Sequence, residues 1–377
     1  MELIAIVLII GAVIAAEAIV FSKYASGGIY YAATVDKTTV YEGDIIELSE
    51  IIENRRLVAL PWIKTELSAS KWLAFFKKDS AAQTISNENT FIPGVFSLSP
   101  KSRCTRVRRI KCLKRGVFSF DNTVITATDI LGLITKTFHI DVNITVTVLP
   151  TASDGEDAVL SFTEPIGETT VKRFINEDPF LIAGAKEYTG REPLSRIHWK
   201  HTASKGALYV YSNEYSTANN TLVLMNMQRR NVYPITCVDF WDLEAFIKLS
   251  VKLVEDSIHS GGSAAFAASG GNGSCCSDIL HSEEETLPLL KSLAELSDTC
   301  TTEFSDFLGT VNCGVFTDII IISSYIDDAM KEFADRLTAG GKNVAFFTSG
   351  STEDAEGYNY LTVSRFAFRT NLEGGAV

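Results

Sequence analysis

The sequence contains no Cys-x-x-Cys pair, although it has seven cysteines. Cys275 and Cys276 are adjacent and cannot easily bridge to each other, and an odd number leaves at least one thiol over. This cysteine usage favours a reducing, cytoplasm-like compartment over an oxidising one.

Recognisable catalytic and phosphate-binding motifs are missing too. The chain has no Gly-x-Gly-x-x-Gly, no Gly-x-Ser-x-Gly elbow and no evident Cys-His constellation. The glycine clusters at 261–262 and 270–273 are not followed by Lys and then Ser or Thr. We therefore expect them to be flexible loops rather than phosphate cradles.

An excess of positive charge is also absent. The sequence has 34 Lys and Arg against 46 Asp and Glu, a net charge of −12, which argues against general nucleic-acid binding. Apolar residues, by contrast, are plentiful: 46% of the chain is hydrophobic and 21% is charged. A chain of 377 residues with this composition predicts two or three domains with buried cores.

The N-terminus carries a long apolar run, from Leu3 to Phe21, interrupted by Glu17. A run of this length predicts a transmembrane helix over residues 1–22. No basic residue precedes it, unlike in a cleaved signal peptide, and Lys23 follows it. We expect a single-pass protein of the cell membrane with its soluble domains in the cytoplasm. The alternative is a buried core helix.

Residues 28–150 show alternation with period two, interrupted by turn signals every 8–12 residues and by no long helical pattern. This pattern predicts an antiparallel β-sandwich. The expected strands include 31–40, 45–52, 91–98, 105–113, 117–120 and 143–149.

Residues 221–365 alternate between short apolar runs and helical patterns, which predicts a parallel sheet covered on both faces. Asp242 is the expected N-cap of the first of these helices, which runs to His259. The expected strands are 222–227, 263–268, 318–323, 342–348 and 358–363, and the expected helices are 242–259, 287–296 and 327–337.

A distinctive stretch at 186–211 lies in the region 151–220 that connects these two domains. It resembles the signature of the bacterial family known as domain of unknown function 58, which has Arg-Glu-Tyr, a Gly-Asp turn, Arg-x-Ile-x-Trp-Lys and Leu-x-Val. Lys186, Arg191, Glu192 and Ser204-Lys205 depart from that pattern. The matching residues are Glu187, Tyr188, Arg196, Ile197, Trp199, Lys200, Ala203, Leu208 and Val210.

The resemblance extends to two turns, Lys114–Phe118 and Thr128–Leu133, and covers most of residues 30–350. It implies a von Willebrand factor A-like α/β domain of Rossmann type at the C-terminus. The family usually has two N-terminal transmembrane helices, where we find one. It also implies a MoxR-type AAA+ ATPase and a transglutaminase-like membrane protein as possible partners, whereas the family's biochemical activity is not established.

The von Willebrand A fold can hold Mg²⁺ through Asp-x-Ser-x-Ser after its first strand, because hard cations prefer carboxylate and hydroxyl oxygens. This chain has Asn226, Gln228 and Arg230 at those three positions, next to Met227 and Arg229. A neutral amide is a weak ligand and an arginine repels a cation. We therefore expect a degenerate site with no metal and no cofactor.

The segment 187–201 is the best candidate for a functional site. Glu187, Arg196 and Lys200 can form a charge-assisted network beside Tyr188 and Trp199. One interpretation makes Trp199 a core anchor, a second makes the cluster a partner surface, and a third makes it the site of an enzyme of unknown reaction.

Two further clusters are ambiguous. His198 and His201 lie three apart near Glu192, but a third spaced ligand is lacking, so we expect surface histidines. The segment from Lys101 to Arg115 holds eight basic residues. These either meet anionic headgroups or form a solvated strand face.

The sequence thus predicts a membrane-anchored, non-enzymatic scaffold or interaction protein. The alternatives are an enzyme with its site at 187–201 and a structural envelope component facing outside. The expected partner-binding residues are Glu187, Tyr188, Arg196, Trp199, Lys200, Arg229 and Arg230.

Overall fold

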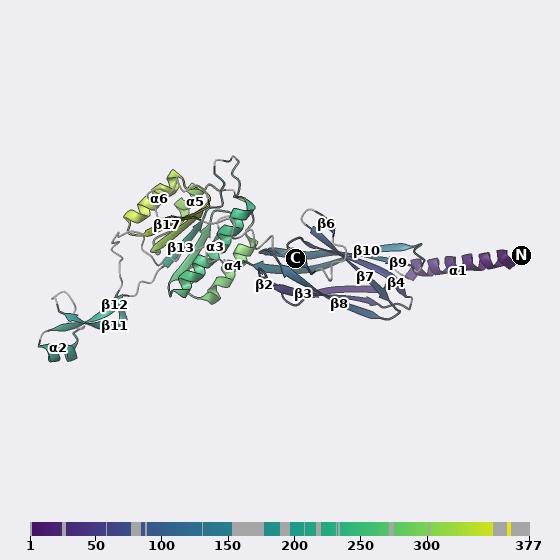
Figure 1. Cartoon of the computed structure of the whole chain (residues 1–377), viewed down its shortest axis with the longest axis horizontal. Coiled ribbons are helices and arrows are strands. Elements are labelled where there is room, and N and C mark those ends of the chain that lie inside the picture. The colour runs from purple at the N-terminus through teal and green to yellow at the C-terminus, as the bar shows by residue number, and fades with distance from the viewer. Residues whose placement is uncertain are drawn as a thin grey trace. The chain divides into compact units, whose positions relative to one another are not determined.

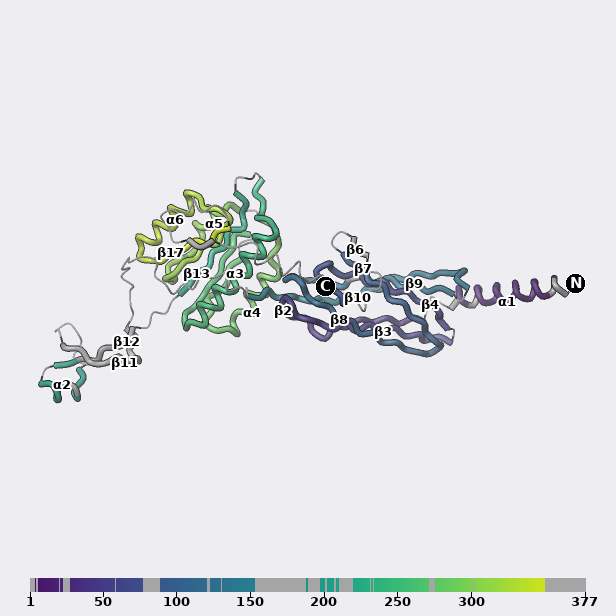
Figure 2. Tube along the Cα trace, viewed as in Figure 1, coloured from purple at the N-terminus to yellow at the C-terminus, as the bar shows by residue number. Residues whose placement is uncertain are grey.

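The chain forms two compact units, seen in a computed structural model and traced in Figures 1 and 2. Unit 1 contains the described residues up to Ala152 together with Pro288–Leu296, and unit 2 contains the described residues of 177–287 and 297–362. The structure describes residues 2–24, 28–57, 59–76, 84–86, 89–129, 131–152, 177–188, 197–206, 208–215, 220–230, 232, 234–270, 275–300, 302–349 and 360–362.

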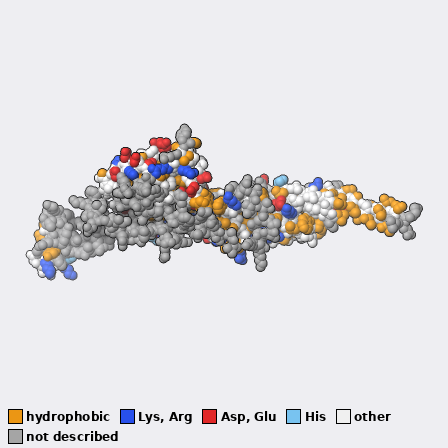
Figure 3. All heavy atoms as spheres, turned by 45° about the horizontal axis from the view of Figure 1, so that its top comes forward, with side chains coloured by type: hydrophobic (Ala, Val, Ile, Leu, Met, Phe, Trp, Pro, Cys, Tyr) orange, Lys and Arg blue, Asp and Glu red, His pale blue; other side chains and the backbone are white. Residues whose placement is uncertain are grey.

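Helix α1 (Glu2–Tyr24) opens unit 1, and many of its apolar side chains are exposed (Figure 3). Within the described residues, no helix reaches the length and apolarity needed to cross a membrane. The predicted transmembrane helix is therefore wrong, and with it the predicted single-pass location in the cell membrane. The apolar run was counted through Phe21, but this side chain is only 2% exposed and packs with Tyr31 and Ile52 in the core of unit 1.

The rest of unit 1 is mainly two β-sheets packed face to face. One core cluster takes buried side chains from both sheets, Ile46, Leu48 and Ile110 from one and Leu67 and Ile92 from the other. The predicted antiparallel sandwich is thus present, with a single parallel pairing between β2 and β10. The first sheet has the order β1 (Ile29–Val35), β3 (Ile45–Asn54), β8 (Arg103–Cys112), β5 (Leu73–Phe75), and the second β2 (Thr39–Tyr41), β10 (Thr135–Leu149), β9 (Gly116–Thr128), β4 (Leu60–Ser70), β7 (Asn89–Leu98), β6 (Thr84–Ser86).

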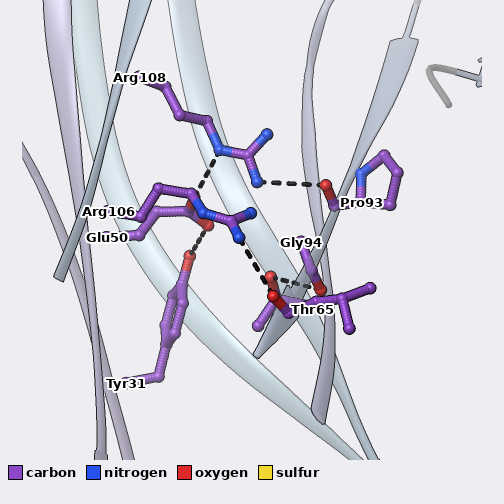
Figure 4. A network of polar contacts seen from close by, with 8 residues as sticks. Tyr31, Glu50, Thr65, Pro93, Gly94, Arg106 and Arg108 are labelled. Atoms are coloured by element: carbon purple, nitrogen blue, oxygen red, sulfur yellow. Dashed lines mark hydrogen bonds and ion pairs between the residues drawn. The ribbon is translucent and has the colours of Figure 1, made fainter. Parts of the chain in front are cut away.

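A buried ion pair lies in the interior of the sandwich, between the neighbouring strands β3 and β8 of the first sheet (Figure 4). Arg108 Nε donates to Glu50 Oε2 at 2.7 Å, and both side chains are 1% exposed. The Tyr31 hydroxyl donates to the other carboxylate oxygen at 3.0 Å. Burial and the charge on Glu50 raise the pKa of Tyr31 above its usual range, so this hydroxyl keeps its proton as a donor.

Gly94 makes room for this network. A Cβ at Gly94 would lie 2.5 Å from Thr65 Oγ1 and 3.0 Å from the guanidinium groups of Arg106 and Arg108. Because the strand lacks a side chain there, Arg108 reaches Pro93 O at 3.2 Å and Arg106 reaches Val95 O at 3.1 Å.

Five of the eight basic residues of 101–115 lie on β8, where the pleat of the strand divides them between its two faces. Arg108 points inward, whereas Arg109 points outward and pairs with Glu47 on β3 at 3.5 Å. Register places Arg103 opposite Glu53, whose carboxylate also pairs with Arg55 at 3.2 Å. Glutamates therefore lie next to two of the outward arginines, which favours the solvated strand face over a surface for anionic headgroups.

Unit 2 contains a six-stranded sheet in which the predicted parallel pairing is present. The order is β15 (Cys275–Cys276), β14 (Ser263–Ala268), β13 (Asn220–Met225), β16 (Asp318–Ser323), β17 (Asn343–Thr348), β18 (Tyr360–Thr362), and only β15 is antiparallel to its neighbour. The helices that follow in the chain are α3 (Phe240–His259), the 3-10 turn η4 (Glu283–Glu285), α4 (Thr286–Glu295), α5 (Phe304–Thr310) and α6 (Asp328–Ala339).

The described elements confirm most of the helices and strands expected here and correct one cap. The N-cap of α3 is Asp239, not Asp242 as predicted: the Asp239 side chain accepts from Asp242 N at 2.9 Å. The apolar periodicity used for the prediction starts only at Leu243, one turn after the cap.

The predicted fold class as a whole is wrong. The described chain is mostly β-sheet with few helices, lacks a described membrane-spanning helix, and does not support the von Willebrand factor A-like assignment. The resemblance rested mainly on 186–211. The described parts of that stretch form a separate two-stranded sheet, β11 (Glu177–Glu187) with β12 (Tyr209–Tyr215), and helix α2 (Trp199–Lys205). A motif there does not define the class of the parallel sheet.

The buried ion pair generates a stability prediction. Glu50→Ala leaves Arg108 charged and buried, so we expect a loss of about 3–5 kcal/mol in the free energy of unfolding by urea titration. Glu47→Ala is the matched control, because its pair with Arg109 is exposed and contributes about 0–1 kcal/mol. Equal losses in the two variants would contradict the role given to the Glu50–Arg108 pair.

Candidate functional site at the switch point of the parallel sheet

The parallel sheet has one switch point, between β13 and β16. From β13 the chain continues to β14 on one side, and it later returns to β16 on the other side and proceeds outward to β17. In open parallel sheets, ligands bind in the crevice outside the carboxyl ends of the strands at such a point. The candidate site is therefore the set of residues directly after β13 and at the end of β16.

Asn226 links β13 to β16 at this switch point. Its side chain is fully buried, and Nδ2 donates to Ser323 Oγ at the end of β16 at 2.9 Å. Its Oδ1 accepts from Gln228 N at 2.9 Å, and its backbone N donates to Ile322 O at 2.8 Å. Both ends of the side-chain amide thus have partners within the protein.

The Gln228 side chain caps the start of α5. The N-cap residue Glu303 makes no side-chain hydrogen bond to that helix, whereas Gln228 Oε1 accepts from Phe304 N at 2.9 Å. One of the otherwise unsatisfied donors of the first turn is satisfied in this way. The amide predicted to be a poor metal ligand is a helix cap supplied from another loop.

Two buried serines and a tyrosine complete the network. Ser269, directly after β14, accepts from Met227 N at 3.3 Å through its hydroxyl, and its carbonyl accepts from the Cys300 thiol at 3.3 Å. Tyr325 N donates to Ser323 Oγ at 3.3 Å, and its side chain hydrogen-bonds with Asn226. Burial raises the pKa of Tyr325, so the hydroxyl stays neutral.

Two described stretches after β13, Met227–Arg230 and 234–238, pair as a short antiparallel ribbon, and we call these two stretches the arginine loop. Val238 N donates to Met227 O at 2.8 Å, and Arg229 N donates to Thr236 O at 2.8 Å. Arg229 and Arg230 are exposed, and the Arg230 guanidinium lies 5.9 Å from the centre of the Tyr325 ring. The loop thus presents two cations beside a closed polar network.

The side-chain oxygens at the positions expected for a metal site already have hydrogen-bond partners. Asn226 and Gln228 use their side-chain oxygens for backbone amides. In the described part of the chain, three or more His, Cys, Asp or Glu side chains nowhere gather as a possible metal site. The expected lack of a metal stays a prediction, and these hydrogen bonds are its physical reason.

Of the other predicted site residues, those that the structure describes lie on the β11–α2–β12 hairpin. Arg196 and Glu192 fall outside the described residues, and for Glu187 and His201 only the backbone is described. Tyr188 N donates to Leu208 O at 2.8 Å, which ties the two strands of the hairpin together.

Ile197 and Trp199 differ in how far their side chains are exposed to solvent. Ile197 is 6% exposed, whereas Trp199, the first residue of α2, is 67% exposed, and Lys200 beside it is exposed too. The core-anchor interpretation therefore fits Ile197 but not Trp199. That Trp199 and Lys200 bind a partner together with Arg229 and Arg230 of the arginine loop stays a prediction.

Sequence reasoning missed Ser269, Ser323 and Tyr325. Ser269 directly follows one predicted strand and Ser323 ends another, and these are the positions where polar residues of parallel strands meet at one edge. That signal was in the sequence. The order of the strands was not, and without it Ser323 cannot be assigned to Asn226, nor Ser269 to Met227.

Comparisons with known proteins leave the family undetermined: no family profile and no curated protein matches the sequence. Part of the chain is similar to the CARDB domain of a Pyrococcus furiosus protein, at 12% identity and a TM-score of 0.20, over 32% of this chain and 94% of that one. A second similar structure is Spo0M, a sporulation control protein of Bacillus subtilis, at 12% identity and 0.20, over 32% and 49%. A third is a non-cellulosomal cohesin of Archaeoglobus fulgidus, at 14% identity and 0.21, over 33% and 93%.

Likenesses at these TM-scores carry no argument about function.

Proposed function

We propose that the protein is a non-enzymatic interaction module that binds an acidic partner surface through the arginine loop. One contrast carries the proposal: the polar side chains at the switch point hydrogen-bond to one another, whereas Arg229 and Arg230 next to them are exposed. A reacting site needs donors and acceptors that a substrate can use. Here the groups that reach outward are two cations.

The loop is suited to binding because its base is fixed. Gln228 is held at both its backbone N and its side-chain Oε1, and Val238 is held on Met227. A partner therefore has less loop entropy to remove on binding than it would with a free segment. Arginine is favoured at such contacts because it binds carboxylates through two parallel hydrogen bonds.

The positive charge of the arginine loop indicates that its partner is acidic. The chain as a whole has a net charge of −12, so two adjacent arginines form a local positive region on an acidic protein. Such a region attracts an acidic surface and steers its approach. A MoxR-type AAA+ ATPase is the partner that the resemblance at 186–211 implies, and a transglutaminase-like membrane protein is a second. The enzyme alternative at 187–201 stays an untested prediction.

The proposal predicts the effect of reversing the loop charge. Arg229→Glu with Arg230→Glu should weaken binding to the MoxR-type ATPase of the same organism by tenfold or more, because like charges across an interface cost several kcal/mol. Stability should fall by only about 1 kcal/mol, the value of an exposed cation–π contact such as that of Arg230 with Tyr325. Binding can be measured by biolayer interferometry at low and high salt.

A matched control is Lys37→Glu with Lys111→Glu, which makes the same change in net charge at two exposed positions of the sandwich. If this control weakens binding as much as the loop variant does, net charge rather than the arginine loop accounts for the effect, and the proposal fails.

Trp199 provides a second prediction. Its side chain is 67% exposed, so Trp199→Ala should change the free energy of unfolding by less than about 1 kcal/mol. Ile197→Ala, at the buried neighbour, should cost about 2–5 kcal/mol. If Trp199 belongs to the partner surface, its removal should lower affinity by about 2 kcal/mol. A loss of stability as large as that of Ile197→Ala would instead make Trp199 a core residue.

A further inference from the structure

Strand β10 of the sandwich has a long edge beside which no described strand lies. On one side β10 pairs with β9 along most of its length, from Thr135 to Val148. On the other side β2 pairs with Thr147–Leu149, and none of the strands that the structure describes pairs with residues 135–146. The backbone N–H and C=O groups along such an edge are a template for a further strand.

The other edges of the sandwich are shorter. β6 and β5, at the borders of the two sheets, have three residues each, and β1 has seven. Short edge strands are one of the ways in which proteins prevent pairing with other chains. In β10 the register shifts between Asp141 and Ile144, where Asn143 has φ +51°, so a β-bulge ends the regular part of the edge near Val142.

The side chains of residues 138–142 alternate between two faces. Phe138, Ile140 and Val142 point toward the interior and pack against the core of the sandwich, yet they are only partly buried. His139 and Asp141, between them, are exposed on the outer face. A further strand beside β10 would therefore cover apolar side chains on one face and meet a base and an acid on the other.

This segment is complementary to a second copy of itself. Residues that lie opposite each other in an antiparallel pair share one face of the sheet. With a two-fold axis at Ile140, each Phe138 lies opposite Val142 of the other copy, and the two Ile140 side chains meet. On the outer face each His139 then lies opposite Asp141 of the other copy. An axis at His139 would instead place the two histidines face to face.

We propose that the free edge of β10 is a self-association surface, at which two copies of this chain pair antiparallel through residues 138–142 about a two-fold axis at Ile140. The second sheet of one sandwich then continues into that of the other, as in other cases of strand addition at a sheet edge. Such a contact uses the same patch on both copies and closes at two, so it does not propagate into a fibre. The surface belongs to unit 1 and is independent of what the arginine loop binds.

Disulfide cross-linking of the full chain tests the position of the axis. Opposite residues of an antiparallel pair have Cα atoms about 4.5–5.5 Å apart, which is within reach of a disulfide. Ile140→Cys, oxidised with copper phenanthroline, should therefore give a covalent dimer that peptide mapping shows to be linked at position 140. The unsubstituted chain, with its seven cysteines, gives the background.

Thr137→Cys is the matched control on the same strand. It lies three residues from the axis, so its two copies are about 20 Å apart along the paired strands and should not link to each other. All variants keep helix α1, so any association through the exposed apolar side chains of that helix is the same in each.

A charge swap tests the register without any added cysteine. His139→Asp places two carboxylates opposite each other in both outer pairs, so dimerisation measured by sedimentation velocity should weaken about tenfold. Combining His139→Asp with Asp141→His exchanges the two members of each pair and should restore dimerisation to within about threefold of the native value.

Any of three results would overturn the proposal. The first is the absence of a link at position 140, or an equally strong link at position 137. The second is dimerisation that His139→Asp leaves unchanged, or that the charge swap does not restore. The third is a link from position 140 to a different protein and not to a second copy, which would make the edge a site for another protein's strand. None of these results bears on binding by the arginine loop.

Discussion

The hydrogen bond from Asn226 to Ser323 is the interaction on which the functional account depends. It joins the ends of two adjacent parallel strands at the place where such sheets usually admit a ligand. Because the same amide also accepts from Gln228 N, the following residue is held where its side chain can cap α5. The arginine loop starts from this fixed point, so closing the crevice and presenting Arg229 and Arg230 are two results of one local structure.

Buried polar contacts organise both units in a similar way. In the sandwich, Arg108 and Glu50 satisfy each other away from water, and the bare backbone at Gly94 gives Arg108 access to a further carbonyl. Arg115 and Lys342 each collect three carbonyls that local structure leaves over. Taking a cation out of water costs desolvation energy, and Arg108 and Arg115 both lie where acceptors converge.

The local periodicity of apolar residues predicted most of the described helices and strands. It could not predict which strands pair or which side chains pack together. The strand 263–268 and the helix ending at His259 could be read from apolar spacing, because burial on one or both faces leaves that pattern. The spanning helix was wrong, since no described helix is long and apolar enough to cross a membrane, and apolar spacing also did not show that Phe21 packs in the core. The stretch at 186–211 that carries the resemblance was predicted as part of a connecting region, and the extension of the resemblance to a fold class failed. Ser323 and Tyr325 were missed because pairing with Asn226 depends on strand order.

The most direct test of the central claim is thermal unfolding of the protein in increasing Mg²⁺ and Mn²⁺. The account predicts no shift in melting temperature, because Asn226 and Gln228 already use their oxygens in hydrogen bonds and Arg230 repels a cation. A metal present at about a hundredfold excess over its dissociation constant would stabilise the protein by roughly 2.7 kcal/mol, so a site would be plain to see. A saturable shift that Asn226→Ala abolishes would contradict the claim that the switch point is closed.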